Sequence, residues 1–525
     1  MLFAALVVAA FRPQLPAARG DPIAVEGGLI AGSRGADPAV RVFKGIPYAA
    51  PPLGALRWRP PQPVPPWPGV RRADAFAPSE LQVPRAENSI TYEQRQTLSE
   101  DCLYLNVWTA AASPGEKRPV LLYIHGGGFT IGEGTKPGYD GEGLCRKGAV
   151  VVTINYRLNI FGFFAHPELS RESGRNVSGN YGLLDMIAAI KWTRRNIAGF
   201  GGDPDRITIF GESAGSIAVS ALTTSPLLRG QIHGAIAQSI LYVKAPGLAD
   251  LEEKGARFAA ATGARSIADL RQMPADQLFR DYLRLGATVL WWPVVDNWVL
   301  RGDLLSQEEN GEGAAIPILT GSNADEGFVL NPAESAASLR TRIRALYGPA
   351  ASQAFFRLYP ADSDSAAAAA QNLAARDKIA WEHQQWAALR SRHGRRTYLY
   401  FFTHAPPLPA GVRYYSGDRL LPEHLGAFHT SDIHYIFNSL DQVKRPWQAY
   451  DRKLADIMSS YWVNFAARGD PNGAGLPPWP EFASSAKPVM ELGDEVRPMR
   501  PVLTESASAF WGANYSRADS VWSLW

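Results

Sequence analysis

Several segments of this chain, each about the length of a β-strand, consist almost entirely of apolar residues. Segments with a helical pattern lie between them. The runs cover residues 120–128, 149–156, 207–213, 315–323 and 397–404. A strand with one face in water would alternate apolar and polar residues, whereas a strand buried on both faces is apolar throughout. The runs therefore predict a central sheet that is mostly parallel and covered on both sides.

Helical segments supply the covering layers. Residues 181–197, YGLLDMIAAIKWTRRNI, have five apolar residues on one helical face. Repeated strand and helix units predict an α/β fold, which we expect to form one domain over residues 21–525. The stretches 251–307 and 333–387 are mainly helical in pattern, and we expect helical insertions there, over the sheet and its active site. The alanine-rich DSAAAAAQNLAAR in the second stretch predicts a solvent-exposed helix, because alanine is the best helix former.

Composition and charge exclude several classes of protein. Hydrophobic residues make up 46% and charged residues 20% of the chain, as in ordinary globular proteins. The net charge of +3 comes from 53 basic and 50 acidic residues spread along the chain, so no polybasic arm for nucleic acid or anionic lipid stands out. Cys102 and Cys145 have no metal-type spacing and form at most one disulfide, so we expect no metal site.

The N-terminus has features of an export signal. An apolar run from Leu2 to Phe11 precedes Arg12, Pro13 and small residues, and it is too short to span a bilayer. No basic residue precedes the run, so a buried first strand or a mis-set start is the alternative. We expect a signal peptide at 1–20, a secreted or periplasmic protein, and no stable membrane insertion.

The stretch RITIFGESAGSIAVSAL, residues 206–222, carries the clearest chemical motif. GESAG matches GxSxG, in which a serine stands on a strained turn between a strand and a helix. The following helix points the partial positive charge of its N-terminus at the serine oxygen. A glycine-rich turn with a capping serine is the structural alternative. The pattern predicts that Ser213 is a nucleophile.

A nucleophilic serine needs N–H donors for the oxyanion of a tetrahedral intermediate. IHGGGF places three glycines directly after a predicted strand, where bare backbone can approach a substrate carbonyl. The alternative is a flexible turn. We expect the donors to be the amides of Gly127, Gly128 and Ala214.

The nucleophile also needs a base and an acid, which follow it in the chain order acid, then histidine. The loop GSNADEGF offers Asp325 and Glu326 just after a predicted strand end. HLGAFHTSDIHYIF offers three histidines; His434 has helical spacing with its apolar neighbours, whereas His429 precedes a TSD that we expect to cap a helix. The residues by themselves do not choose between the two acids, and a structural role for His429 is the alternative.

These motifs resemble, in order, the blocks of the type-B carboxylesterase and cholinesterase family of α/β-hydrolases, in its bacterial para-nitrobenzyl esterase-like branch. Further matching blocks are FKGIPYAAPPLGALRWRPP, SEDCLYLNVW, INYRLNIFGF and YWVNFAARGDPN. The resemblance extends from about Ala24 to about Phe482. It implies an α/β-hydrolase fold and a catalytic mechanism without a cofactor.

The resemblance also implies roles for individual residues. It matches Ser213 to the nucleophile, Glu326 to the acid and His429 to the base, and it supports the same oxyanion donors. Glu212 corresponds to a family glutamate held near the site, where it would favour an imidazolium or order water; a buried structural carboxylate is the alternative. Two structural ion pairs are implied as well, Arg57 with Glu100 and Arg157 with Asp185.

The departures from the family concern substrate and cysteine pairing. Residues 73–101 lack the usual partner of Cys102, so we expect a free thiol unless Cys145 lies within reach. Tyr92 stands where cholinesterases place the tryptophan that binds choline, which disfavours choline esters.

The remaining substrate-pocket residues follow from the same resemblance. Ala287 and Val289 are smaller than the phenylalanines of animal relatives and would admit a bulkier acyl group. Trp291 and Trp292 line the pocket or only support it, with packing expected for at least one of them.

We therefore expect a hydrolase that cleaves a fairly bulky, non-choline, small-molecule ester through an acyl-enzyme. Two alternatives stay open. One is an amidase, lactonase or carbamate hydrolase that uses the same residues, and the other is a non-catalytic binding protein. Oligomeric state is not predictable from these patterns.

Overall fold

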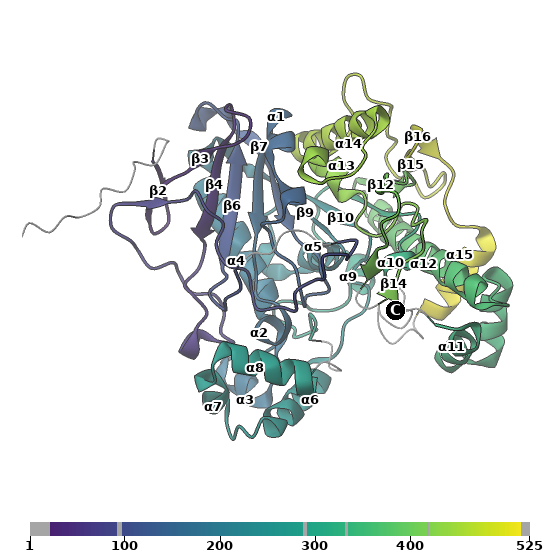
Figure 1. Ribbon diagram of the computed structural model, residues 1–525, viewed down its shortest axis with the longest axis horizontal. Coiled ribbons are helices and arrows are strands. Elements are labelled where there is room, and N and C mark those ends of the chain that lie inside the picture. Colours follow the sequence, from purple (N-terminus) through teal and green to yellow (C-terminus); the bar gives the residue numbers. More distant parts are fainter. Residues whose placement is uncertain (1–21, 92–96, 287–290, 331–333, 417–418, 516–525) are drawn as a thin grey trace, which may run out of the picture.

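The computed structural model describes residues 22–91, 97–286, 291–330, 334–416 and 419–515 (Figure 1). Within these ranges an 11-stranded sheet has the order β16-β15-β12-β11-β10-β9-β7-β8-β6-β4-β3. Its strands are β3 (Ser33–Arg34), β4 (Arg41–Pro47), β6 (Tyr104–Thr109), β7 (Arg118–Ile124), β8 (Val150–Ile154), β9 (Gly202–Glu212), β10 (Gly234–Gln238), β11 (Ile318–Asn323), β12 (Thr397–Phe402), β15 (Val489–Leu492) and β16 (Val496–Met499).

The middle of this sheet is parallel. Each neighbouring pair from β8 through β7, β9, β10, β11 and β12 to β15 runs parallel, whereas β16 at one edge and β6, β4 and β3 at the other pair antiparallel. The five apolar runs form β7, β8, β9, β11 and β12. The prediction of a mostly parallel sheet is confirmed.

Both faces of the sheet are buried, which explains the continuous apolar runs. In β7, Leu122 packs into the hydrophobic cluster on one face and Leu121 into the cluster on the other, and both are fully buried. The first cluster includes side chains of α4 (Tyr181–Asn196) and α5 (Ala214–Thr224). The second includes side chains of α1 (Glu142–Arg146) and α14 (Ala449–Arg468). Helices therefore cover both faces, as predicted.

The two expected helical insertions differ in where they pack. In the first, α6 (Leu248–Ala261), α7 (Ile267–Gln272) and α8 (Ala275–Asp281) gather near α3 (Pro167–Glu172) at the lower end of the view in Figure 1. In the second, α11 (Ala336–Leu358) is followed by α12 (Asp364–Arg392), which contacts β11 and β12 directly. The second insertion is therefore in part a covering layer of the sheet.

The alanine-rich start of α12 corrects one expectation. This segment is helical, but Ala367, Ala370 and Ala374 are buried in a cluster with α11 and α15 (Glu505–Asn514). Alanine lets helices approach closely, so one side of this helix packs against its neighbours and only the other faces solvent. The prediction of a solvent-exposed helix is therefore wrong for the packed side.

Both structural ion pairs are present and buried. Arg57 Nε lies 2.6 Å from Glu100 Oε1, and Arg57 Nη1 also donates to the Leu270 carbonyl in the helical insertion at 2.7 Å. Arg157 Nη2 lies 2.7 Å from Asp185 Oδ1. The first pair ties the N-terminal part of the chain to the insertion.

The two cysteines are free and buried. Cys102 belongs to the cluster on one face of the sheet, where its thiol donates to Glu80 Oε2 at 3.6 Å. Cys145 belongs to the cluster on the opposite face. Since the sheet separates them, they do not pair, and the prediction of a free thiol at Cys102 is confirmed.

The expected signal peptide falls within residues 1–21, outside the described residues. In the part of the chain that the structure describes, no helix combines the length and the apolar character that crossing a membrane requires.

Candidate active site

The turn between β9 and α5 places Ser213 at the carboxyl end of the sheet. Its φ of 58° and ψ of −125° lie outside the ordinary regions for a residue with a side chain, so the backbone is strained there. A Cβ on Gly211 would lie 2.7 Å, and one on Gly215 2.0 Å, from the Ile124 carbonyl oxygen. Only glycine fits at either position, because β7 lies against the turn.

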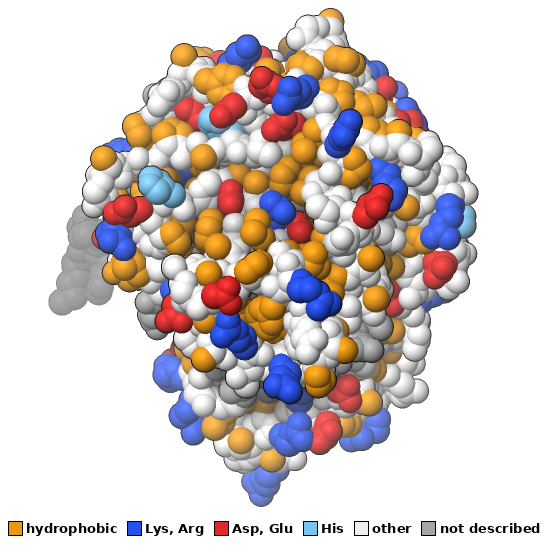
Figure 2. Space-filling model, turned by 90° about the vertical axis from the view of Figure 1, so that its right-hand side faces the viewer, with side chains coloured by type: hydrophobic (Ala, Val, Ile, Leu, Met, Phe, Trp, Pro, Cys, Tyr) orange, Lys and Arg blue, Asp and Glu red, His pale blue; other side chains and the backbone are white. Residues whose placement is uncertain are grey.

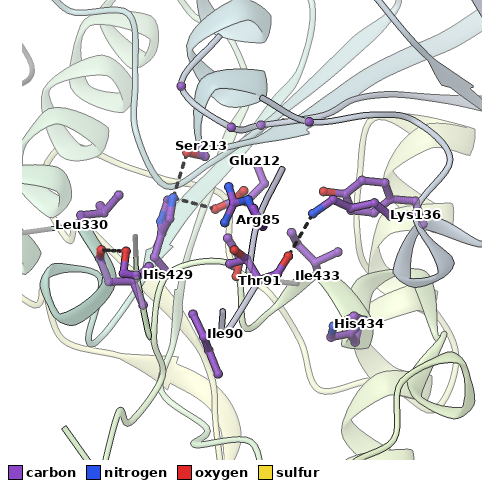
Figure 3. Close-up of a pocket in the computed structure, with 18 of the residues that line it drawn as sticks. Arg85, Ile90, Thr91, Lys136, Glu212, Ser213, Leu330, His429, Ile433 and His434 are labelled. Atoms are coloured by element: carbon purple, nitrogen blue, oxygen red, sulfur yellow. Dashed lines mark hydrogen bonds and ion pairs between the residues drawn. The ribbon is translucent and has the colours of Figure 1, made fainter. Parts of the chain in front are cut away.

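His429 joins Ser213 to Glu326, and Figure 3 shows its imidazole directed toward Ser213 and Glu212. Its Nε2 lies 2.8 Å from Ser213 Oγ, and its Nδ1 is hydrogen-bonded to Glu326 Oε2. The other oxygen, Glu326 Oε1, accepts a hydrogen bond from the backbone amide of Asn323 at 2.9 Å. All three side chains are buried. Ser213 follows β9, Glu326 follows β11 and His429 lies in the long connection after β12, so the topology gathers them at one edge.

Asp325, the competing acid, has a different task. Its Oδ2 accepts from the Ala427 amide and its Oδ1 from Asn372 Nδ2, both at 2.9 Å. The backbone of Asp325 also forms a bridge with Phe428. Asp325 therefore fixes the segment that leads into His429, and of these two neighbouring acids Glu326 is the one that contacts the imidazole.

The glycine loop after β7 approaches the serine closely. A Cβ on Gly126 would lie 2.9 Å from Ser213 Cβ, and one on Gly127 would lie 2.0 Å from the Ile131 carbonyl oxygen. Gly127 and Gly128 have positive φ values of 113° and 64°. Among the described residues, no acceptor takes a hydrogen bond from the amides of Gly127, Gly128 or Ala214. These amides are available to an anion beside the serine.

Comparison with known proteins identifies the family. The model of the carboxylesterase family matches residues 21–511. The chain belongs to the carboxylesterase family. It is 37% identical to fumonisin B1 esterase of Sphingopyxis macrogoltabida over 88% of this chain and 85% of that protein. It is 31% identical to para-nitrobenzyl esterase of Bacillus subtilis (strain 168) over 87% of this chain and 92% of that one.

Solved structures agree with this assignment. A carboxylesterase of Geobacillus stearothermophilus superposes with a TM-score of 0.76 and 31% identity, over 94% of this chain and 99% of that chain. The fold is accordingly the α/β-hydrolase fold, and the protein is a carboxylic ester hydrolase related to bacterial type-B carboxylesterases.

In this carboxylesterase, Glu212 also faces the imidazole. Its Oε1 lies 3.2 Å from His429 Nε2, and its side chain is 2% exposed. Burial raises the pKa of Glu212 above its usual range, and the charge of nearby His429 opposes this rise. Burial lowers the pKa of His429, but the carboxylates of Glu212 and then Glu326 outweigh burial and raise that pKa to about 9. The two carboxylates therefore favour the imidazolium form of His429.

We expect Glu212→Gln to shift the pH dependence of ester hydrolysis. His429 accepts a proton only when neutral, and loss of a nearby negative charge lowers its pKa. The acid limb of kcat/KM should therefore move to lower pH, by about one unit, while kcat at the optimum falls because the imidazolium loses a partner. A pH–rate profile of both proteins checks this, and an unshifted limb would contradict the electrostatic role.

Asp432 is a buried acid that the sequence patterns did not single out. The TSD segment was expected to cap a helix, but the Asp432 side chain makes no capping hydrogen bond to α13 (Ile433–Phe437). It turns inward and accepts from Gln238 Nε2 at 3.1 Å and from Tyr400 Oη at 3.2 Å. Burial and Glu326 raise its pKa to about 6. Asp432 thus links β10 and β12 beneath the site.

The pocket at Ser213 is a cavity of about 200 Å³. Ser213, His429, Glu212 and the glycine loop line it, together with Ile90, Val329, Leu330 and other side chains. Tyr92, Ala287 and Val289, predicted to lie near the substrate, fall outside the described residues.

Trp291 takes one of the two roles that were predicted for it. It is fully buried, with its ring centroid 5.2 Å from that of Phe164 and 6.2 Å from that of Phe258. Trp292 packs edge-on against Phe129, at 4.9 Å between ring centroids. Packing is therefore the role of Trp291, because its indole completes an aromatic cluster.

Cationic side chains in the pocket were missed entirely. Arg85, Lys136 and Arg445 line it, and so does His434, which lies in α13 as its helical spacing predicted. The three cations belong to separate loops and to no motif. No pattern in the sequence signals that such residues converge.

Proposed function

We propose that this carboxylesterase hydrolyses non-choline, small-molecule esters by two-step acyl transfer through Ser213. The observation that carries the proposal is the buried hydrogen-bonded chain in which His429 bridges Ser213 and Glu326. Serine acyl transfer requires a nucleophile, a base and an acid that orients the base, in this arrangement.

In the first step, Ser213 Oγ attacks the ester carbonyl carbon while His429 Nε2 takes the hydroxyl proton. The carbonyl oxygen becomes an oxyanion that accepts hydrogen bonds from the amides of Gly127, Gly128 and Ala214. The bond to the alcohol then breaks, the alcohol leaves with the proton from His429, and the acyl group stays on Ser213. Water repeats the sequence and releases the acid and free Ser213. Glu326 holds the imidazole in the tautomer that presents Nε2 as the acceptor.

The nature of the alcohol follows from the charge of the pocket. A choline ester carries a quaternary ammonium, and this pocket is lined by Arg85, Lys136 and Arg445, which would repel it. A non-choline alcohol is therefore part of the proposal. The preference for a bulky acyl group stays a prediction, because Ala287 and Val289 lie outside the described residues.

A graded series of p-nitrophenyl esters, from acetate to long-chain acyl groups, tests the mechanism together with an alkyl fluorophosphonate. We expect turnover that stops as one phosphonate adduct forms, and peptide mass mapping should place it on Ser213. Butyrylthiocholine serves as the cationic comparison and should react much more slowly than a neutral ester of the same acyl group. Turnover that continues with Ser213 fully modified, or an adduct on another serine, would overturn the proposal.

A further inference from the structure

Asp432, just before α13, accepts hydrogen bonds from side chains of three neighbouring strands. Its Oδ2 accepts from Gln238 Nε2 of β10 at 3.1 Å and from Tyr400 Oη of β12 at 3.2 Å. Its Oδ1 accepts from Asn323 Nδ2 of β11 at 3.3 Å. All four side chains are buried. Because β10, β11 and β12 are adjacent in the sheet, one carboxylate joins three strands beneath the active site.

Gln238 connects Asp432 to the nucleophile. It is the last residue of β10, and its backbone carbonyl accepts a hydrogen bond from the backbone amide of Ser213 at 3.1 Å. The backbone of Ser213 is strained, and such a conformation persists only where surrounding contacts hold it. Gln238 supplies one of those contacts through its backbone, while its side chain is fixed by Asp432.

Asn323 connects Asp432 to the acid and the base. Its backbone amide donates to Glu326 Oε1 at 2.9 Å. Its side-chain Nδ2 donates to Asp432 and also, at 2.9 Å, to the carbonyl of Phe428, the residue before His429. Rotation of this side chain would release the Phe428 carbonyl. Asp432 therefore helps to fix Glu326 and His429 relative to each other.

The orientation of both side-chain amides indicates a strong acceptor at Asp432. Gln238 Oε1 and Asn323 Oδ1 have no hydrogen-bond partner among the described residues, whereas both NH2 groups face the Asp432 carboxylate. An ionised carboxylate only accepts hydrogen bonds, so it attracts the donor end of each amide. An asparagine in its place would turn its own NH2 group toward at least one of these donors.

The charge of Asp432 acts in the interior of the protein. On the face shown in Figure 2, acidic side chains lie at the surface among basic ones, where water and salt weaken their effect. Asp432 is fully buried and lies close to the catalytic residues. Burial lowers the pKa of His429, and the carboxylates of Glu212, Glu326 and Asp432 raise it. The charge and the hydrogen bonds of Asp432 thus act on the same site.

We propose that Asp432 is a positioning residue, which holds the nucleophile, the base and the acid of acyl transfer in place through Gln238 and Asn323. This inference rests on the proposed function and adds a residue to it. Asp432 is not among the residues that line the pocket, so it acts through its partners without touching the substrate. Loss of its carboxylate should therefore lower kcat and leave KM nearly unchanged.

The Asp432→Asn variant tests the inference, and Asp377→Asn is the matched control. Asp377 of α12 is also buried and also accepts from a tyrosine hydroxyl, Tyr359 Oη at 3.0 Å. We measure kcat and KM for p-nitrophenyl butyrate with the full-length wild-type protein and both variants. The rate at which an alkyl fluorophosphonate labels Ser213 is measured as well, and near-UV circular dichroism checks folding.

We expect Asp432→Asn to lower kcat and the labelling rate about a hundredfold, because small displacements of reacting groups slow the reaction strongly. KM should stay within about threefold of wild type. The control should keep both rates, since Asp377 takes no part in these hydrogen bonds. Wild-type kcat in a folded Asp432→Asn protein would overturn the inference. An equal loss in the control, or a loss confined to KM, would overturn it as well.

The Gln238→Met variant decides the question if Asp432→Asn does not fold. It removes the Nε2 donor to Asp432 and keeps the backbone carbonyl that accepts from Ser213. We expect kcat to fall about tenfold with little change in KM. Wild-type kcat in the folded Gln238→Met protein would then overturn the inference.

The failures of the two proposals are distinguishable. If the wild-type protein and a folded Asp432→Asn variant hydrolyse the ester equally well, the positioning role is refuted and the esterase proposal stands. If the folded wild-type protein does not hydrolyse the ester, the proposed function itself fails, and this inference fails with it.

Discussion

Replacing Ser213 with alanine is expected to reduce kcat for p-nitrophenyl esters by about a million-fold. The residue supplies the atom that forms the acyl-enzyme, and His429 alone cannot replace it, because these groups act as a unit. Ester hydrolysis under saturating substrate, together with loss of phosphonate labelling, measures the effect.

Ser216→Ala is the matched control for that substitution. Ser216 lies one helical turn further along α5, is fully buried, and its hydroxyl has no hydrogen-bond partner among the described residues. The change removes the same atom from a nearby position, so we expect wild-type activity. Substantial turnover by a folded Ser213→Ala protein would refute acyl transfer through this residue.

Replacing Glu326 with glutamine should reduce kcat by about ten-thousand-fold. The carboxylate accepts a hydrogen bond from His429 Nδ1, which leaves Nε2 free to accept the serine proton. A glutamine can donate its amide hydrogen to Nδ1 instead, which would put the imidazole proton on Nε2 and prevent it from acting as a base. Folding of the variant is checked by near-UV circular dichroism, since Glu326 also accepts from the Asn323 amide.

The Asp325→Asn variant tests whether the adjacent acid shares the role of Glu326 in orienting His429. An asparagine at this position can still accept from the Ala427 amide, so we expect the His429 segment to stay in place and activity to remain within about tenfold of wild type. If the two substitutions cause equal losses, Glu326 is not the residue that orients the base.

How much of this site was predictable depends on the distance between its parts along the chain. Ser213 and its flanking glycines form a local motif, because the turn from strand to helix needs small residues at fixed spacing. Glu326 and Asp325 are neighbours in one loop, and the local sequence pattern does not show which of them is the catalytic acid. Resemblance to the family favoured Glu326, and the hydrogen bond to His429 in the folded chain agrees with it.

The residues of the pocket wall could not be predicted from local sequence patterns. Lys136, Arg445 and Arg85 lie in loops of unrelated sequence and meet only because the sheet brings the strand ends together. Trp291 is a large aromatic residue of the kind that lines substrate pockets, yet its ring packs against Phe164 and Phe258. Side-chain type in a loop does not reveal which neighbours surround it.

By itself, the sequence determined the parallel sheet, the two-sided helical cover and the turn that carries Ser213, since each follows from periodicity or local sterics over a few residues. Only the tertiary structure decided that Asp432 turns into the sheet and that Arg85, Lys136 and Arg445 line one pocket. Those features depend on contacts between residues far apart in the chain, and packing of the whole domain sets such contacts.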